Sequence, residues 1–300
     1  MHNDPARHVM RARFILLLLL PVLGVAACGK DDSYNGRSAD EWAGLLRSSN
    51  ADERARAGEA FSVTGPHQRD HVMALLRAAD DPDSTAHVEI LNAINKLPDA
   101  ASKVLVDALR DPHLTVRRAA AAGLGHFRRD DNDSIKGLIA SLRDPDDSVR
   151  TLAVASLGAR SIGALDALPD IRRLATTPGP QRAVALTVLP NIDTESRSLL
   201  SVYQPAVSDT SAAVRAAAVS MILTAANDHS VIPTVVAALN DHDPQVRIAA
   251  ARVLGSEAHH DSVAAQAMRK ARASTDSSVR RLADSILAAN AAPATIRRAP

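Results

Sequence analysis

Aromatic side chains are scarce in this sequence. Its 300 residues include three Phe, two Tyr and one Trp, although 46% of the chain is hydrophobic. Alanine and leucine supply most of the apolar content instead. Because ligand pockets are usually lined by larger hydrophobic and aromatic side chains, this composition argues against a deep pocket for a large cofactor. It favours the close packing of helices against one another.

An excess of charge of either sign is also missing. The formal net charge is +1, and the residues after the first 27 contain 32 basic and 33 acidic side chains. A protein that binds nucleic acid needs a basic surface that neutralises phosphates. The global charge therefore gives no support to a nucleic-acid partner, and we expect none.

Cysteine occurs once, at Cys28, so a disulfide within the chain is excluded. Three arginines precede an uncharged run, 14–27, which ends in small residues directly before this cysteine. A basic start, an apolar run and small residues at its end are typical of a secretory signal peptide. The run is shorter than the roughly 20 residues that a helix needs to span a bilayer.

The end of this run, Val25-Ala26-Ala27-Cys28, resembles a bacterial lipobox. The resemblance implies a signal peptide over 1–27 and lipidation of Cys28, which would leave a membrane-anchored lipoprotein facing the periplasm. Gly29 at the next position favours the outer membrane over the inner one, and the polar residues 28–37 would form a tether. The alternatives are an ordinary signal peptide cut nearby and an uncleaved anchor.

One pattern fills most of the remaining chain. It is clearest from Leu109 to Gly125, and it returns from Leu142 to Gly158 and from Leu239 to Gly255. A regular period of 30 to 33 residues predicts a solenoid rather than a compact globule. One column of the pattern is occupied by Arg54, His87, Arg117, Arg150, Arg182, Arg215, Arg247 and Arg280.

Each unit predicts two helices joined by a turn. Before the turn, apolar residues recur at i, i+3, i+4 and i+7, as in Ile135, Leu138, Ile139 and Leu142. After it, a second stripe of apolar and small residues begins one position before the arginine column. Ser38 and Glu41 have the spacing of a capping box at the start of the first unit, and Asp243-Pro244 is typical of a helix start.

Some positions depart from this regularity. Gly125, Gly158 and Gly255 follow the second stripe, where a left-handed residue can close a helix. The fifth unit is the most divergent, and its Pro178-Gly179-Pro180 turn and Pro190 predict a kink rather than a domain boundary. The stripe is lost from Asn290, so we expect a disordered tail over 290–300.

With D-P-x-x-x-V-R-x-x-A-x-x-x-L-G as its core, the unit resembles the short bacterial HEAT repeats first noted in phycobilisome lyases. About eight such units cover 38–289. The resemblance implies an all-α fold, a right-handed α-solenoid of stacked helix pairs whose second helices line the concave face.

The resemblance also implies a role for the acids and arginines of the unit. In HEAT proteins such groups form a ladder, in which each carboxylate accepts hydrogen bonds from turn amides and from an arginine, often of the adjacent repeat. The ladder residues expected here are Asp81, Asp111, Asp144, Asp209, Asp241, Arg117, Arg150, Arg215, Arg247 and Arg280. A feature repeated along a solenoid concerns stacking, so we do not expect these residues to be catalytic.

No chemical site stands out among the remaining residues. His67 and His71 are four positions apart, and His259-His260-Asp261 and Asp241-His242-Asp243 form local clusters, but no second matching histidine pair follows at the repeat spacing. Solvated histidines in loops and at helix ends are the simpler interpretation. Nucleophile and phosphate-loop motifs are absent. We therefore expect no catalytic, cofactor-binding or metal-binding residues.

Two kinds of enzyme built on HEAT repeats form the alternative. Di-iron hydroxylases of this class carry repeated His-Glu pairs, whereas the nearest match here is His87-Val88-Glu89, which occurs once. A bilin lyase would need a larger aromatic surface than six aromatic residues provide. The alternative function is thus a lyase-like or metal-dependent HEAT-repeat enzyme, or an enzyme accessory protein.

The preferred function is a lipid-anchored, non-catalytic scaffold that binds other proteins in the bacterial cell envelope. An open solenoid offers an extended surface rather than an enclosed cavity. We expect a monomer that reaches the membrane through its N-terminal lipid and binds protein partners on the concave face. Side chains expected to point away from the apolar stripe are Arg118, Thr151, Ile248, Arg252 and Arg281.

Overall fold

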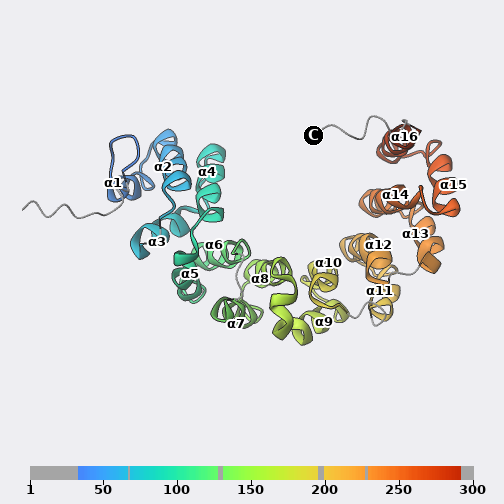
Figure 1. Ribbon diagram of the computed structural model, residues 1–300, viewed down its shortest axis with the longest axis horizontal. Helices are drawn as coiled ribbons and strands as arrows, with labels where there is room; N and C mark the ends of the chain where they lie inside the picture. The colour runs from blue at the N-terminus through green and yellow to red at the C-terminus, as the bar shows by residue number, and fades with distance from the viewer. Residues whose placement is uncertain (1–32, 67, 128–130, 195–198, 227–228, 292–300) are drawn as a thin grey trace, which may run out of the picture. The chain divides into compact units, whose positions relative to one another are not determined.

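The computed structural model describes residues 33–66, 68–127, 131–194, 199–226 and 229–291. These residues form α-helices and short 3₁₀ segments, with one isolated β-bridge and no strand. The helices alternate as first and second members of pairs (Figure 1). The first helices are α1 (Ala39–Leu45), α3 (Arg69–Ala78), α5 (Ser102–Ala108), α7 (Asn132–Ser141), α9 (Leu168–Thr176), α11 (Leu200–Ala206), α13 (Ile232–Ala238) and α15 (Ser262–Ala271).

The second helices form the other half of each pair. They are α2 (Ala51–Thr64), α4 (Ser84–Asn95), α6 (Leu114–Leu124), α8 (Asp147–Ala159), α10 (Arg182–Ile192), α12 (Ala212–Ala226), α14 (Pro244–Glu257) and α16 (Ser277–Ala291). The short 3₁₀ segments are η1 (Asp99–Ala101), η2 (Ser161–Ala167) and η4 (His229–Val231).

Helix-to-helix contacts follow the order of the chain. Each first helix packs on the second helix of its own pair, and each second helix packs on the second helix of the next pair. The helix pairs of the described residues thus pack against their neighbours in sequence, which is the organisation of a solenoid. The prediction of an all-α solenoid with about eight helix pairs is confirmed for the described residues.

Polar side chains in the turns determine where many helices begin. Ser38 Oγ accepts a hydrogen bond from the Glu41 N–H at 3.3 Å, while Glu41 accepts from the Ser38 N–H at 2.8 Å, which completes the predicted capping box. Asp243 accepts from the Gln245 N–H at 2.8 Å, with Pro244 at the first position of α14. These caps pair backbone N–H groups that have no partner inside the helix.

Three glycines of the repeat have a different role from the one predicted. Gly158 and Gly255 lie inside α8 and α14, and Gly125 ends α6 with a right-handed φ of −66°. The prediction that they close helices in a left-handed conformation is therefore wrong. A Cβ atom added at Gly158 would lie 2.3 Å from the Cβ of Val188, and one at Gly255 would lie 2.3 Å from Cδ1 of Ile286. The missing side chains let the second helix of the next pair approach.

The irregularity near the fifth unit lies before its first helix and not at the prolines from which a kink was predicted. It is η2, a 3₁₀ helix in which Ala164 has non-helical angles and Ser161 has a φ of +54°. Pro190 lies within α10, two residues before that helix ends at Ile192. The chain continues through this region without separating into two compact units, since the described residues on either side of it belong to one unit.

The first described residues fold back onto the first helix. Tyr34 and Arg37 exchange backbone hydrogen bonds of 3.0 and 3.1 Å across a turn in which Asn35 and Gly36 both have positive φ. Trp42 Nε1 donates to the Tyr34 carbonyl at 3.1 Å, and the Arg37 guanidinium lies 5.1 Å from the centre of the indole ring. Trp42 is 4% exposed as a result. This part of the segment 28–37, expected to be a tether, is therefore packed on the first repeat.

The remaining domain predictions concern the two ends of the chain, a signal peptide and a disordered tail. The signal peptide over 1–27 and Cys28 lie outside the described residues. At the other end, α16 continues to Ala291, so the first two residues of the segment 290–300 are helical. Within the described ranges, no helix combines the length and the apolar character needed to cross a membrane.

Candidate functional site

Arginines of the repeat column connect one turn to the next. Arg117, near the start of α6, donates from Nη1 to the backbone oxygen of Asp111 at 3.1 Å, in the turn of its own pair. Its Nε and Nη2 donate to the carboxylate of Asp144 at 2.9 and 3.2 Å, in the turn of the next pair. One guanidinium thus holds two consecutive turns, because its donors are fixed in a planar fork.

The same link recurs along the chain. Each carboxylate in the turns also accepts from a backbone N–H two residues later, as Asp144 does from Asp146 at 2.9 Å. Hydrogen bonds from Arg54 and Arg215 hold the pKa values of Asp81 and Asp241, respectively, below the ordinary range, because they stabilise the charged form. The other links join Arg54 to Asp81, Arg182 to Asp209, Arg215 to Asp241 and Arg247 to Asp276.

Burial of these groups decides what they can do. The side chains of Arg117 and Asp144 are 15% and 7% exposed, and that of Arg215 is 6% exposed. Their donors and acceptors are occupied by each other and by turn carbonyls. Such groups are poorly placed to meet a ligand, and the geometry supports a role in stacking.

Three of the predicted ladder residues, Asp111, Arg150 and Arg280, lack a link to a neighbouring pair. Asp111 accepts from the backbone N–H of His113 at 2.9 Å, and the column position one unit earlier holds His87, whose Nδ1 lies 2.8 Å from the carbonyl oxygen of Ala79. Arg150 donates to the carbonyl oxygens of its own turn and pairs with Asp147 of its own helix. Among the described residues, no arginine of the column therefore links the turns of the second and third pairs or those of the fourth and fifth pairs. More exposed ion pairs lie there instead: Arg69–Asp107 and Arg118–Asp80 between the second and third pairs, and Arg143–Asp170 between the fourth and fifth.

The last link uses an acid that the sequence pattern did not select. The position six residues before Arg280 holds Ser274, and Arg247 instead pairs with Asp276, to which its Nε donates at 3.0 Å. Asp276 also caps α16 by accepting from the Ser278 N–H at 2.8 Å. Arg280 donates to the carbonyl oxygens of Ser274 and Thr275 in its own turn. The signal for Asp276 was an acid displaced by two residues from the expected column.

The histidine clusters occupy unrelated places. His71 is 4% exposed, and its Nε2 lies 2.7 Å from Oδ1 of Asp40, while His67 lies outside the described residues. His242 Nε2 is 3.1 Å from Nη2 of Arg215, and the rings of His259 and His260 lie 6.3 Å apart. Among the described residues, no group of three His, Cys, Asp or Glu side chains has a spacing suited to a metal ion.

The side chains predicted to face a partner differ in availability. Arg252 and Arg281 are exposed on α14 and α16 and form no ion pair with the described residues. Ile248 is half-buried, and the hydroxyl of Thr151 donates to the Asp147 carbonyl at 2.8 Å. Arg118 is half-buried and lies 3.3 Å from Asp80. The exposed pair Arg252 and Arg281 is the best placed for contact.

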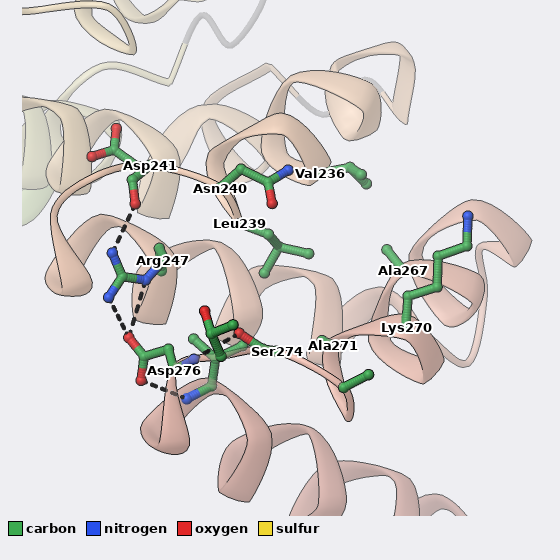
Figure 2. A pocket seen from close by; sticks show the side chains of 13 residues that line it. Val236, Leu239, Asn240, Asp241, Arg247, Ala267, Lys270, Ala271, Ser274 and Asp276 are labelled. Atoms are coloured by element: carbon green, nitrogen blue, oxygen red, sulfur yellow. Dashed lines mark hydrogen bonds and ion pairs between the residues drawn. The ribbon is translucent and has the colours of Figure 1, made fainter.

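A hollow that the sequence did not predict lies between α13 and α15. Its volume is about 670 Å³, and Figure 2 shows Asn240 and Leu239 on the α13 side and Lys270 and Ala271 on the α15 side. The link between Arg247 and Asp276 closes one end. The hollow, which we call the α13–α15 groove, is lined by Val236, Leu239, Asn240, Asp241, Arg247, Ala267, Lys270, Ala271, Ala273, Ser274, Thr275, Asp276 and Val279.

Several solved structures share the fold. The protein YibA of Escherichia coli is 15% identical over 83% of this chain and 92% of its own, with a TM-score of 0.52. A model of the full-length AP-3 complex gives 14% identity and a TM-score of 0.54, over 83% of this chain and 50% of the other, so this chain spans half of it. The complex of CpcE and CpcF of phycocyanin lyase from Nostoc sp. PCC7120 gives 20% identity over 85% and 97%, with a TM-score of 0.44. At these identities the likeness concerns the fold alone.

A search of the curated proteins finds no sequence that matches this chain. A search against protein families gives a match to HEAT repeats at residues 102–190 and 200–288, which is more than half of the chain. Both matches consist of the helix pairs and acid–arginine turns described above. The chain therefore belongs to the HEAT-repeat family.

Proposed function

We propose that this protein is a lipid-anchored, non-catalytic scaffold that binds other proteins in the bacterial cell envelope. The observation that supports the binding role is a difference in exposure between the recurring and the varying residues of the repeat. The charged groups that recur between units are buried in links between turns, whereas residues that vary, such as Arg252 and Arg281, are exposed. Solenoids present extended surfaces of this kind to their partners.

Binding through exposed second-helix residues can be tested in cells. A photo-crosslinking residue at Arg252 or at Arg281 should capture the same protein, because both positions lie on the second helices of neighbouring pairs. Gln204 is an exposed residue of a first helix, α11, and provides the matched control. Capture of the same protein from Gln204, or of nothing from the other two positions, would contradict a partner on this surface.

The anchor rests on the lipobox resemblance at Cys28. Replacing Cys28→Ser removes the thiol that would be acylated, so labelled palmitate should no longer be incorporated and the protein should leave the membrane fraction. Ser33→Ala, outside the lipobox, serves as the control. Unchanged labelling and fractionation of the Cys28 variant would count against the anchor.

The enzymatic alternative makes the opposite prediction about the purified protein. A lyase-like or metal-dependent protein would retain a tight, stoichiometric chromophore or metal through purification. The scaffold proposal predicts neither, and metal analysis with an absorption spectrum distinguishes the two.

A further inference from the structure

The α13–α15 groove contains one lining charge that is not paired. Asp241 is held by Arg215, and Asp276 is held by Arg247, so three of the four charged residues of the lining belong to ladder links. Lys270 is the fourth, and it forms no ion pair with any described residue. It lies in the last turn of α15, where a cation also interacts favourably with the helix dipole. The groove therefore offers one free positive charge.

The floor of the groove is apolar and incompletely covered. Val236 and Leu239 are half-buried although their side chains are hydrophobic. Opposite them, Ala267 and Ala271 are too small to fill the space between the two helices. An apolar side chain from another molecule would remove this surface from water, which is favourable.

The rim carries polar groups that have no hydrogen bond from their side chains to other described residues. They are the carboxamide of Asn240 and the hydroxyl of Thr275, both on exposed residues. A carboxamide can donate and accept at the same time, so it matches the N–H and C=O groups of an extended peptide. A groove with an apolar floor and such a rim suits a chain segment better than an enclosed small molecule.

A second hollow, between α5 and α7, shows why the charge matters. It measures about 480 Å³, and its lining includes Lys103, Arg110 and Lys136 together with Asp107, Asp131 and Asp133. Asp107 is paired with Arg69, but Asp131 and Asp133 form no ion pair with the described residues, so unpaired charges of both signs remain in this hollow. The α13–α15 groove differs because both of its acids are paired with arginines, which leaves Lys270 as its one unpaired charge.

We propose that the α13–α15 groove binds an extended segment of a partner protein that places an apolar side chain on Leu239 and a neighbouring Asp or Glu carboxylate on Lys270. This inference rests on the proposed function, since it specifies the chemistry of one protein contact. The apolar residue supplies the buried area, and the carboxylate supplies the selectivity.

The test uses the full-length protein in detergent and an array of nine-residue peptides. Each peptide has Leu, Ile, Val, Met or Phe at its centre, and the surrounding positions are all Glu, all Gln or all Lys. We expect the Glu series to bind at least tenfold more tightly than the Gln series by fluorescence anisotropy, and the Lys series not to bind. Equal binding of all three series, or no binding of any, would overturn the proposal.

Variants locate the binding in the groove. Lys270→Glu should weaken the Glu series at least tenfold, and Ala273→Leu, at an exposed lining residue, should do the same by filling the space. Arg269→Glu and Ala237→Leu change exposed residues of α15 and α13 outside the lining and should alter affinity by less than threefold. Undiminished binding by Lys270→Glu would refute the assignment. If capture from Arg252 succeeds in cells and the array fails, the scaffold proposal stands and the groove proposal falls.

Discussion

At the scale of the residue, the column arginine is the most connected group in the repeat. Arg117 donates to a carbonyl oxygen in one turn and to the carboxylate of Asp144 in the next. A buried donor that loses its partner is costly because it has already given up its contacts with water. The link therefore stabilises the stack mainly by ensuring that no charged group between two turns is left unpaired.

Replacing Asp144→Ala should lower the free energy of unfolding by about 1–3 kcal/mol, because it leaves the largely buried guanidinium of Arg117 without its carboxylate. Urea denaturation followed by circular dichroism measures the change. Asp166→Ala, at an exposed residue of η2, should have little effect. If Asp144→Ala keeps full stability and a binding activity is lost instead, the stacking role is wrong.

Acid should weaken the links in a definite pH range. The folded pKa values of Asp81 and Asp241 lie below the ordinary value of 3.8, so their bonds stabilise the fold fully above that pH. This contribution is lost as the pH falls below 3.8 through the folded pKa values. Urea midpoints measured from pH 7 to pH 2 should fall at the acid end, and the fall should be smaller for Asp241→Asn. An identical acid dependence in that variant would argue against the assignment.

Sequence spacing predicted the residue types of these links but not all of their partners. It placed Asp144 and Arg117 in the repeat register, and the structure pairs them. Spacing could not reveal that Asp111 lacks an arginine or that Asp276 replaces Ser274, because a shift of two residues in a turn depends on how that turn folds. Spacing also could not predict the groove around Lys270. The groove arises because Ala267 and Ala271 of α15 are small and because Lys270, on the same helix, has no ion-pair partner among the described residues.

At the scale of the element, the close approach of successive second helices depends on glycines at their contacts, because glycine has no Cβ. Sequence alone did not identify this role, because a left-handed helix end and a close approach both call for a missing Cβ. The structure distinguishes the two through φ and through the atoms that a Cβ would meet. The distance to those atoms also shows which substitutions a neighbour can accommodate.

Gly255→Ala and Gly158→Ala should both destabilise the fold, by about 1–3 kcal/mol for overpacking, and they should respond differently to a second substitution. The added Cβ at Gly255 meets the flexible end of Ile286, so Ile286→Val should restore much of the loss. At Gly158 it meets the Cβ of Val188 itself, so Val188→Ala should restore little. Gly179→Ala, with no atom nearby, is the control for chemical denaturation. Equal rescue at both sites would contradict this account.

At the scale of the whole molecule, the contacts between pairs are uneven. α2 and α4 pack closely, with Gly58 against the backbone of Glu89 and Ile90, whereas α4 and α6 share little contact. The column link is also missing between the second and third pairs. The ion pairs Arg69–Asp107 and Arg118–Asp80 that join them are solvent-exposed, and exposed ion pairs contribute little to stability. Because a solenoid holds together through nearest-neighbour interfaces, this is the position at which the first two pairs can unfold separately.

The single tryptophan makes this separation measurable. Trp42 lies in the first pair, so its fluorescence reports on the first two pairs, whereas circular dichroism reports on every helix. We expect the fluorescence transition at a lower urea concentration than the circular dichroism transition. Hydrogen exchange should show the same order, with 33–97 exchanging before 168–291. Coincident transitions and uniform exchange would contradict a weak interface.

The periodicity predicted the architecture well because the same apolar stripe and the same turn recur in several units, so each copy supports the assignment of helix pairs in the others. It could not predict which interfaces are weak. That property depends on how closely particular backbones approach, as at Gly58, and on single substitutions in the column, as at His87. The units share one sequence pattern, whereas the closeness of packing differs from one pair of contacting helices to the next.

The direction of the arginine link has a consequence for how such a chain evolves. At each linked junction, one unit supplies the arginine and the unit after it supplies the carboxylate. The sixth unit, with Asp209 and Arg215, and the seventh, with Asp241 and Arg247, carry both halves, so a duplicate of either arrives with both halves of the connection. In-frame duplication or loss of one period leaves the chemistry of every other junction intact. Selection can therefore change the number of units independently of exposed positions such as Arg252, which are free to diverge from copy to copy.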